Sequence, residues 1–150
     1  MQKIYLASSF AYADREKTEE RKAIMQQFES NLIERGFIVY NPSKLKIPNA
    51  WDYSMWDWGQ LVFEADYKEL NNCDLVVFIS YGKENNAGSA WEVGYAYAKN
   101  IPIIMVSMDK NSPESLMLLH SARACLAGFE EFINYDLSIL PKTKIDVVES

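Results

Sequence analysis

The stretch Asp-Leu-Val-Val-Phe-Ile-Ser at residues 74–80 is the clearest strand in the sequence. It is apolar and bounded by turn-forming residues, a pattern typical of a central parallel strand that is buried on both faces. Other apolar runs predict further strands at residues 3–7, 37–40, 101–107 and 131–135. The sequence therefore predicts a sheet of five strands.

Helical patterns separate these strands. Apolar side chains recur at spacings of three and four between residues 14 and 35, with Asp14 as a predicted N-cap and Gly36 as the stop. Further helices are predicted at residues 59–72, 89–99 and 113–127. Alternating strands and helices predict an α/β fold, here a single-domain, flavodoxin-like (doubly wound) sandwich over residues 1–150. Its five-stranded parallel sheet should have the order 2-1-3-4-5.

Composition and charge exclude several classes of protein. The net charge of −6 argues against nucleic acid or an anionic membrane as the main partner. No apolar run is long enough for a transmembrane helix, and the N-terminus does not resemble a signal peptide. Cys73 and Cys125 lack metal-type spacing and His120 is the only histidine, so no metal site is expected. Free thiols suit a reducing compartment, and we expect a cytoplasmic protein.

The predicted topology points to one place for a ligand. In open parallel sheets, ligands bind beyond the carboxyl ends of the strands, where the strand order reverses. Here that point lies between the first and third strands, beside Ser8, Ser9, Phe10 and residues 80–89. The rule predicts a location and no chemistry.

The strongest local pattern at this location is the loop and helix of residues 86–96. Its small residues, Gly88 among them, let another group approach, and Glu92 is predicted in the first helical turn, where the dipole favours an anion. Such a carboxylate can be a nucleophile, a general base or an ordinary helix cap. The sequence lacks the glycine-rich dinucleotide and phosphate-loop motifs and the Gly-x-Ser-x-Gly elbow, which argues against those classes of enzyme.

Two other features allow more than one interpretation. Asp66 and Asp74 are two carboxylates that could divide acid and base work if they lie near one site, although a solvated helix face is the more common setting for Asp66. Asp74 is predicted at the amino end of its strand, away from the expected site. The aromatic segment at residues 51–58 could stack on a flat heterocycle, fold over the core or pack in an oligomer interface.

Three blocks of sequence resemble the nucleoside 2-deoxyribosyltransferase family. Residues 88–96 resemble its G-[ST]-A-[FW]-E-[ILV]-G-[YF]-A signature, and residues 3–10 resemble its K-I-Y-L-[AG]-x-P-F start. Trp58, Asp66 and Asp74 match its W-x(7)-D-x(7)-D spacing. Together these blocks cover most of the chain.

The resemblance implies an enzyme of nucleoside salvage that moves a 2-deoxyribosyl group from one nucleobase to another. Its substrates are a deoxyribonucleoside and a free nucleobase, and it needs no metal or organic cofactor. Glu92 would be the nucleophile that forms a covalent deoxyribosyl ester, and Tyr5 would orient it. By the same resemblance Asp74 would hold or protonate the base. The remaining predicted substrate-binding residues are Ser9, Phe10, Trp58, Asn86, Gly88, Ser89, Ser115 and Met117.

Two positions depart from the family pattern. Asn86 replaces an aspartate that holds the sugar 5′-hydroxyl, so the 5′ end should be less anionic and more tolerant of a 5′-monophosphate. Ser115-Leu116-Met117 stands where the family has Asn-x-Met, which a neighbouring subunit contributes, and we expect a homo-oligomer whose sites are completed in this way.

The same departures leave two alternative functions. A related class, the 2′-deoxynucleoside 5′-phosphate N-hydrolases, releases the free base. That class carries Gly-Ser-x-Arg near its N-terminus, whereas residues 8–11 here are Ser-Ser-Phe-Ala, which favours the transferase. A non-catalytic nucleotide-binding module would require Glu92 to be only a helix cap.

Overall fold

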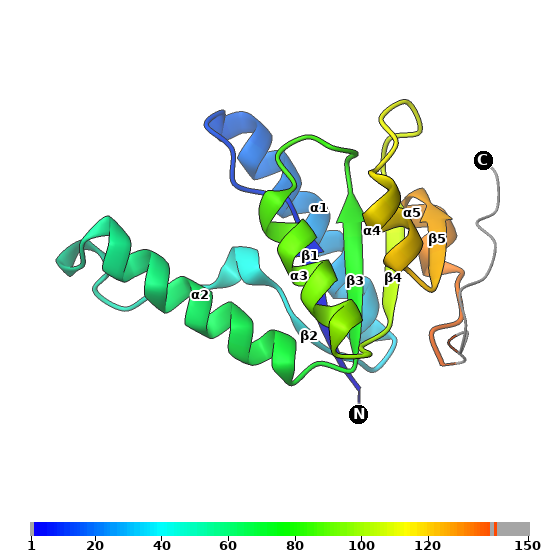
Figure 1. The fold of residues 1–150 in the computed structure, drawn as a ribbon, viewed down its shortest axis with the longest axis horizontal. Coiled ribbons are helices and arrows are strands. Elements are labelled where there is room, and N and C mark those ends of the chain that lie inside the picture. Colours follow the sequence, from blue (N-terminus) through cyan, green and yellow to red (C-terminus); the bar gives the residue numbers. More distant parts are fainter. Residues whose placement is uncertain (1, 139, 141–150) are drawn as a thin grey trace.

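The parallel sheet has the predicted strand order, β2-β1-β3-β4-β5 (Figure 1). The computed structural model describes residues 2–138 and 140. From its sequence we expect the tail after Pro141 to be irregular or ordered by a partner, and it lies outside the described residues. All four strand pairs are parallel. The strands are β1 (Lys3–Ser8), β2 (Ile38–Tyr40), β3 (Leu75–Ser80), β4 (Ile103–Ser107) and β5 (Ala124–Ala127).

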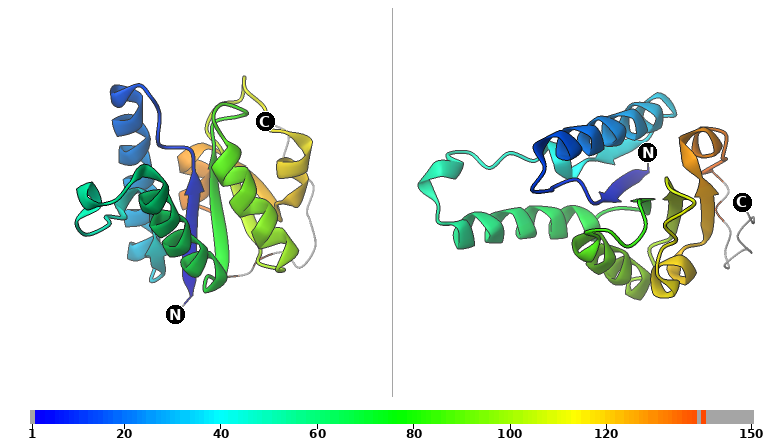
Figure 2. Two further views of the ribbon diagram at one scale, coloured as in Figure 1. Left: turned by 60° about the vertical axis from the view of Figure 1, so that its left-hand side comes forward. Right: turned by 90° about the horizontal axis from the view of Figure 1, so that it is seen from above.

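Helices cover both faces of this sheet, as the view from above shows (Figure 2, right). On one face lie α1 (Arg15–Glu34) and α5 (Gly128–Ile133); on the other lie α2 (Met55–Asn71), α3 (Ala87–Ala98) and α4 (Leu116–Ser121). Two short 3-10 helices, η1 (Pro42–Lys44) and η2 (Ala50–Asp52), connect β2 to α2. No helix among the described residues is long and apolar enough to cross a membrane.

Alternation along the strands divides the core into two clusters. In β1, Ile4 and Leu6 pack in the cluster that also contains Phe28 of α1, whereas Tyr5 and Ala7 pack in the cluster on the α3 face. Successive side chains of a strand point to opposite faces, so each strand supplies both layers. Consequently a polar side chain on the second face of β1 points toward α3.

The boundaries of α1 match the sequence prediction. Asp14 is the N-cap and accepts hydrogen bonds from the backbone N–H groups of Glu16 and Lys17. Gly36 follows the helix with φ +93°, a left-handed conformation that glycine adopts without steric cost.

The predicted fifth strand at residues 131–135 is wrong. The fifth strand is β5, at Ala124–Ala127, and most of the predicted segment belongs to α5 and the turn after it. The chain turns at Gly128, with φ +79°, and the helix then buries Phe132 against Phe28 at a ring-centroid distance of 4.9 Å. Packing against α1 therefore overrides the strand preference of these aromatic and branched residues. The predicted helix at residues 113–127 shortens accordingly to α4.

Two helices begin earlier than predicted. Ser54 caps α2 by accepting a hydrogen bond from the Asp57 N–H, so part of the aromatic segment is helical. This end of α2 extends away from the sheet (Figure 1) and leaves Trp51, Met55 and Trp56 at least 80% exposed. Helix α3 begins at Ala87, two residues before the predicted start.

Candidate active site

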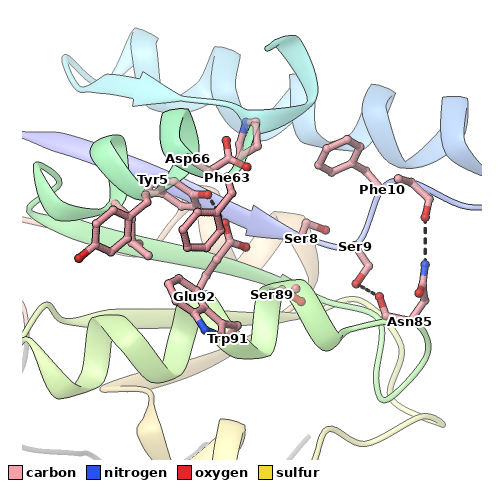
Figure 3. Close-up of a pocket in the computed structure, with 15 residues that line it drawn as sticks. Tyr5, Ser8, Ser9, Phe10, Phe63, Asp66, Asn85, Ser89, Trp91 and Glu92 are labelled. Carbon is pink, nitrogen blue, oxygen red and sulfur yellow. Dashed lines mark hydrogen bonds between the residues drawn. The ribbon is translucent and has the colours of Figure 1, made fainter. Parts of the chain in front are cut away.

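A pocket of about 520 Å³ lies between β1, α2 and α3, at the place that the topology rule predicted. That volume suits a small organic ligand. Six residues predicted for the site from sequence line the pocket: Tyr5, Ser9, Phe10, Gly88, Ser89 and Glu92. At one end Tyr5, Phe63, Asp66 and Glu92 gather, and at the other lie Ser9, Phe10 and Asn85 (Figure 3).

Tyr5 and Glu92 form the centre of the site. The fully buried Tyr5 of β1 donates a hydrogen bond from its hydroxyl to Oε2 of Glu92 on α3. Glu92 is the sixth residue of α3, so the predicted first-turn position is wrong. Because the dipole effect fades beyond the first turn, the helix start does not explain the state of this carboxyl.

Burial instead controls the protonation of Glu92. Desolvation raises the pKa of this carboxyl to about 7, the hydrogen bond from Tyr5 lowers it, and the nearby charge of Asp66 raises it. Burial and the charge of Glu92 also raise the pKa of Tyr5, which therefore stays a donor at neutral pH. Near neutral pH a fraction of Glu92 is therefore ionised, the form that a nucleophile or a general base requires.

Asp66 faces Glu92 across the pocket and does not lie on a solvated helix face. It lines the pocket together with Phe63, Tyr67 and Leu70, which share one face of α2 at spacings of three and four. Burial raises the pKa of the Asp66 carboxyl, and a hydrogen bond from the Tyr40 hydroxyl lowers it. The helical spacing of these four residues could be read from the sequence. A search for apolar residues alone passes over Asp66, because it is the one acidic residue on this face of α2.

Asp74 lies outside the pocket, contrary to the role that the resemblance implied for it. It is exposed at the amino end of β3 and accepts a hydrogen bond from the Lys3 backbone N–H at 2.8 Å. The amino and carboxyl ends of a strand lie at opposite edges of the sheet, so Asp74 cannot reach a ligand beside Ser8. Asp66 is the second carboxylate of the site.

An aromatic wall that the sequence did not predict closes one side of the pocket. Phe63 and Trp91 meet edge to face, with ring centroids 5.4 Å apart, and Tyr67 lies 6.4 Å from Trp91. Trp58, the predicted aromatic contact, is 44% exposed on α2 and is not among the lining residues. Phe63 and Trp91, and not Trp58, therefore offer flat aromatic surface to this pocket.

Hydrogen bonds join the two loops at the other end of the pocket. Ser9 Oγ donates to the Asn85 carbonyl at 2.5 Å, and Asn85 Nδ2 donates to the Ala11 carbonyl at 3.0 Å (Figure 3). Ser8 Oγ is buried at this end and has no hydrogen-bond partner among the described residues. Its hydroxyl therefore has hydrogen-bonding capacity that the described residues do not use.

Comparison with known proteins shows the family to which this chain belongs. A sequence profile described as nucleoside 2-deoxyribosyltransferase matches residues 4–135. The chain belongs to the nucleoside 2-deoxyribosyltransferase family. It is accordingly an enzyme that acts on N-glycosidic bonds. A comparison with curated protein sequences found no match.

One solved structure agrees with this membership, and two more distant ones show the same fold. A 2-deoxyribosyltransferase from Bacillus psychrosaccharolyticus superposes with a TM-score of 0.81 at 26% identity, over 95% of this chain and 98% of that one. A CMP N-glycosidase from Clostridium botulinum shares the fold, with a TM-score of 0.55 at 21% identity over 88% of this chain and 94% of that one. A 2-desoxiribosyltransferase from Leishmania mexicana also shares it, with a TM-score of 0.55 at 13% identity over 100% and 91%.

The residues that depart from the deoxyribosyltransferase pattern lie beside the pocket and do not line it. Asn86 is the N-cap residue of α3, and its Nδ2 donates to Glu114 Oε1 at 2.7 Å. The Ser115 N–H donates to the same oxygen at 2.9 Å, and Ser80 Oγ donates to Glu114 Oε2 at 2.8 Å. Met117, on α4, is 77% exposed. No pattern in the sequence indicated Glu114, because its contacts depend on how two loops meet.

The hydrogen bond between Tyr5 and Glu92 should set the pH dependence of this deoxyribosyltransferase. In wild type, kcat/KM should rise with pH through about 7 as Glu92 ionises. Because the Tyr5 hydroxyl stabilises the ionised carboxylate, Tyr5→Phe should raise the pKa of Glu92 and move this rise upward by about one pH unit. The measurement is the pH profile of kcat/KM. Tyr97→Phe, an exposed change elsewhere on α3, is the control, and an unshifted profile in Tyr5→Phe would contradict the prediction.

Proposed function

We propose that this chain transfers the 2-deoxyribosyl group of a 2′-deoxyribonucleoside to a second nucleobase, through a covalent ester on Glu92. One observation carries the proposal: Glu92 lies in a pocket of ligand size, held by Tyr5, with Asp66 as a second carboxyl in the same pocket. Family membership supports deoxyribosyl transfer as the reaction. A non-catalytic nucleotide-binding module would not need two carboxyls whose pKa values are raised.

Each group has a role in a two-step displacement. The ionised Glu92 attacks the anomeric carbon, the bond from that carbon to the base nitrogen breaks, and its electron pair leaves with the base. Asp66 must enter this step as the carboxylic acid, and it gives its proton to the departing base. A second base then attacks the ester, loses its proton to Asp66 and releases the Glu92 carboxylate. Two displacements at one carbon retain its configuration, as in retaining glycosidases.

The lining of the pocket suits the two substrates, a deoxyribonucleoside and a free nucleobase. Phe63 and Trp91 offer aromatic surface on which a planar base can stack. Ser8 Oγ and Ser9 lie near the other end, where they can meet sugar hydroxyls. No step requires a metal or an organic cofactor.

We make three further proposals, on the biological role, the cellular location and the domain organisation of this protein. Base exchange recycles nucleosides, which suits a role in nucleotide salvage. Cys73 and Cys125 are buried free thiols, which supports a cytoplasmic location. We also propose that residues 1–150 form a single domain, supported by one continuous sheet among the described residues.

Glu92→Ala should lower the rate of base exchange by roughly a thousandfold or more, because the nucleophile is removed. The assay incubates a deoxyribonucleoside with a different free base and separates the products by chromatography. Mass spectrometry of the wild type without an acceptor base should find the deoxyribosyl adduct on Glu92. Asp74→Asn is the matched control and should keep most activity, whereas Asp66→Asn should lose it. Exchange at a near-normal rate by Glu92→Ala, or an adduct on another residue, would refute the proposal.

Glu114 bears on the choice between transferase and 5′-phosphate N-hydrolase. The Asn86 position is not free of negative charge, because the Glu114 carboxylate lies within hydrogen-bond distance of the Asn86 amide. A 5′-phosphate that approached this position would meet a like charge. This observation supports the transferase and replaces our expectation that the 5′ end tolerates a monophosphate.

Glu114→Gln should relax discrimination against a 5′-monophosphate. The ratio of kcat/KM for a deoxyribonucleoside 5′-monophosphate to that for the free nucleoside should rise roughly tenfold, because the repulsion is removed. Glu130→Gln removes an equal charge from the exposed surface of α5 and should leave the ratio unchanged. If the wild type already prefers the monophosphate and releases free base, the hydrolase is the correct assignment.

We further propose that a second copy of the chain completes the site. Apolar side chains support this: Leu116 and Met117 on α4 and Trp51, Met55 and Trp56 near the start of α2 are each at least 67% exposed. Exposed apolar surface of this extent is typical of protein interfaces. Ser115 and Met117 remain the predicted contributors to a neighbour's pocket.

Met117→Glu should weaken the oligomer and lower activity together, because it would bury a charge in the interface. Sedimentation across a dilution series would measure the assembly, and base exchange at the same concentrations would measure activity. Ile33→Glu makes the same kind of change on α1, on the opposite face of the sheet, and is the control. A fully active wild-type monomer would contradict this prediction.

A further inference from the structure

Tyr40 contacts two residues of the active site without lining the pocket itself. It is the last residue of β2, is half-buried and is not among the residues that line the pocket. Its hydroxyl donates to Asp66 Oδ1 at 2.7 Å, and its ring centroid lies 5.4 Å from that of Tyr5. Tyr40 therefore touches both the second carboxylate and the tyrosine that holds the nucleophile.

The site thus contains two parallel pairs, each of one tyrosine and one carboxyl. Tyr5 donates to Glu92, and Tyr40 donates to Asp66. Burial and the charge of Asp66 raise the pKa of Tyr40, so its hydroxyl keeps its proton and can only donate to an ionised partner. The hydrogen bond occupies Oδ1 of Asp66 and leaves Oδ2 as the oxygen that can exchange a proton with a ligand.

The hydrogen bond also limits how Asp66 can move. An aspartate on a helix can rotate about two side-chain bonds, and a partner on a different element removes that freedom. The partner here belongs to the sheet, since β2 pairs with β1 and Tyr40 aligns with Tyr5 in that pair. The same strand pair therefore fixes both tyrosines, and with them the relative positions of the two carboxyls.

We propose that Tyr40 is a positioning residue that acts through Asp66: it holds Oδ1 so that Oδ2 faces the nucleobase for proton transfer. The proposal rests on the proposed function. When the bond to the base breaks, the proton moves from Asp66 Oδ2 to the base nitrogen. When the second base attacks, it gives a proton to Asp66 Oδ2. Because both transfers use Oδ2, the hydroxyl proton of Tyr40 stays on Tyr40 throughout the cycle.

The test combines Tyr40→Phe and Asp66→Asn in a double-mutant cycle. Tyr40→Phe should lower kcat roughly tenfold or more while KM changes little, because proton transfer is impaired and substrate binding is not. Added to Asp66→Asn, Tyr40→Phe should have almost no further effect, because the hydroxyl that it removes acts through that carboxyl, whereas the ring beside Tyr5 is kept. Tyr97→Phe, which removes an exposed hydroxyl, is the matched control.

The pH dependence of kcat distinguishes a positioning role from a merely structural one, which would leave it unchanged. Loss of the Tyr40 hydroxyl removes the contact that favours ionised Asp66, so the fall of kcat at high pH should move to higher pH in Tyr40→Phe. The proposal would be overturned if the losses in kcat of the two single variants multiply in the double variant. It would also be overturned if the pH profile of kcat is unchanged in Tyr40→Phe. If Glu92→Ala keeps normal exchange, the proposed function itself fails; if only the Tyr40 coupling is absent, the function stands and this inference does not.

Discussion

The hydrogen bond from Tyr5 to Glu92 joins the buried sheet to the helix that carries the reactive carboxyl. Tyr5 can face α3 only because Ile4 and Leu6 face α1, and a shift of one residue in β1 would exchange the two faces. Pairing with β2 and β3 on both sides prevents such a shift. The position of one hydroxyl group thus depends on the register of the whole sheet.

Burial and charge then divide the chemistry between two carboxyls in one pocket. Desolvation raises the pKa of both Glu92 and Asp66, and a tyrosine hydroxyl lowers each. The charge of ionised Asp66 also raises the pKa of Glu92, so the two carboxyls share one proton near neutral pH. The proposed displacement uses the state in which this proton lies on Asp66 and Glu92 is ionised. This state supplies a nucleophile and a proton donor together, a division seen wherever two acids in one site differ in environment.

Much of the fold and part of the site could be predicted from local patterns. Apolar runs and capping residues predicted the strand order and α1, and the topology rule predicted the location of the pocket. Short-range patterns failed where distant packing decides: Ala124–Ala127 lacks bulky strand formers yet pairs with β4, and Phe132 is helical because Phe28 covers it. The sequence favoured a solvated helix face for Asp66, because its hydrogen-bond partner, Tyr40, lies on another element. Spacing alone could not distinguish it from Asp74.

The place of Tyr40 at the edge of the sheet affects how the enzyme responds to heat. Strand β2 is three residues long and pairs with one neighbour only, whereas β1 and β3 lie in the interior. Edge segments open locally at a lower free energy than the core that supports them. The part of the molecule that aligns Asp66 is therefore less stable than the part that aligns Glu92. We therefore expect heating to misalign Asp66 by fraying of this edge before the hydrophobic core melts.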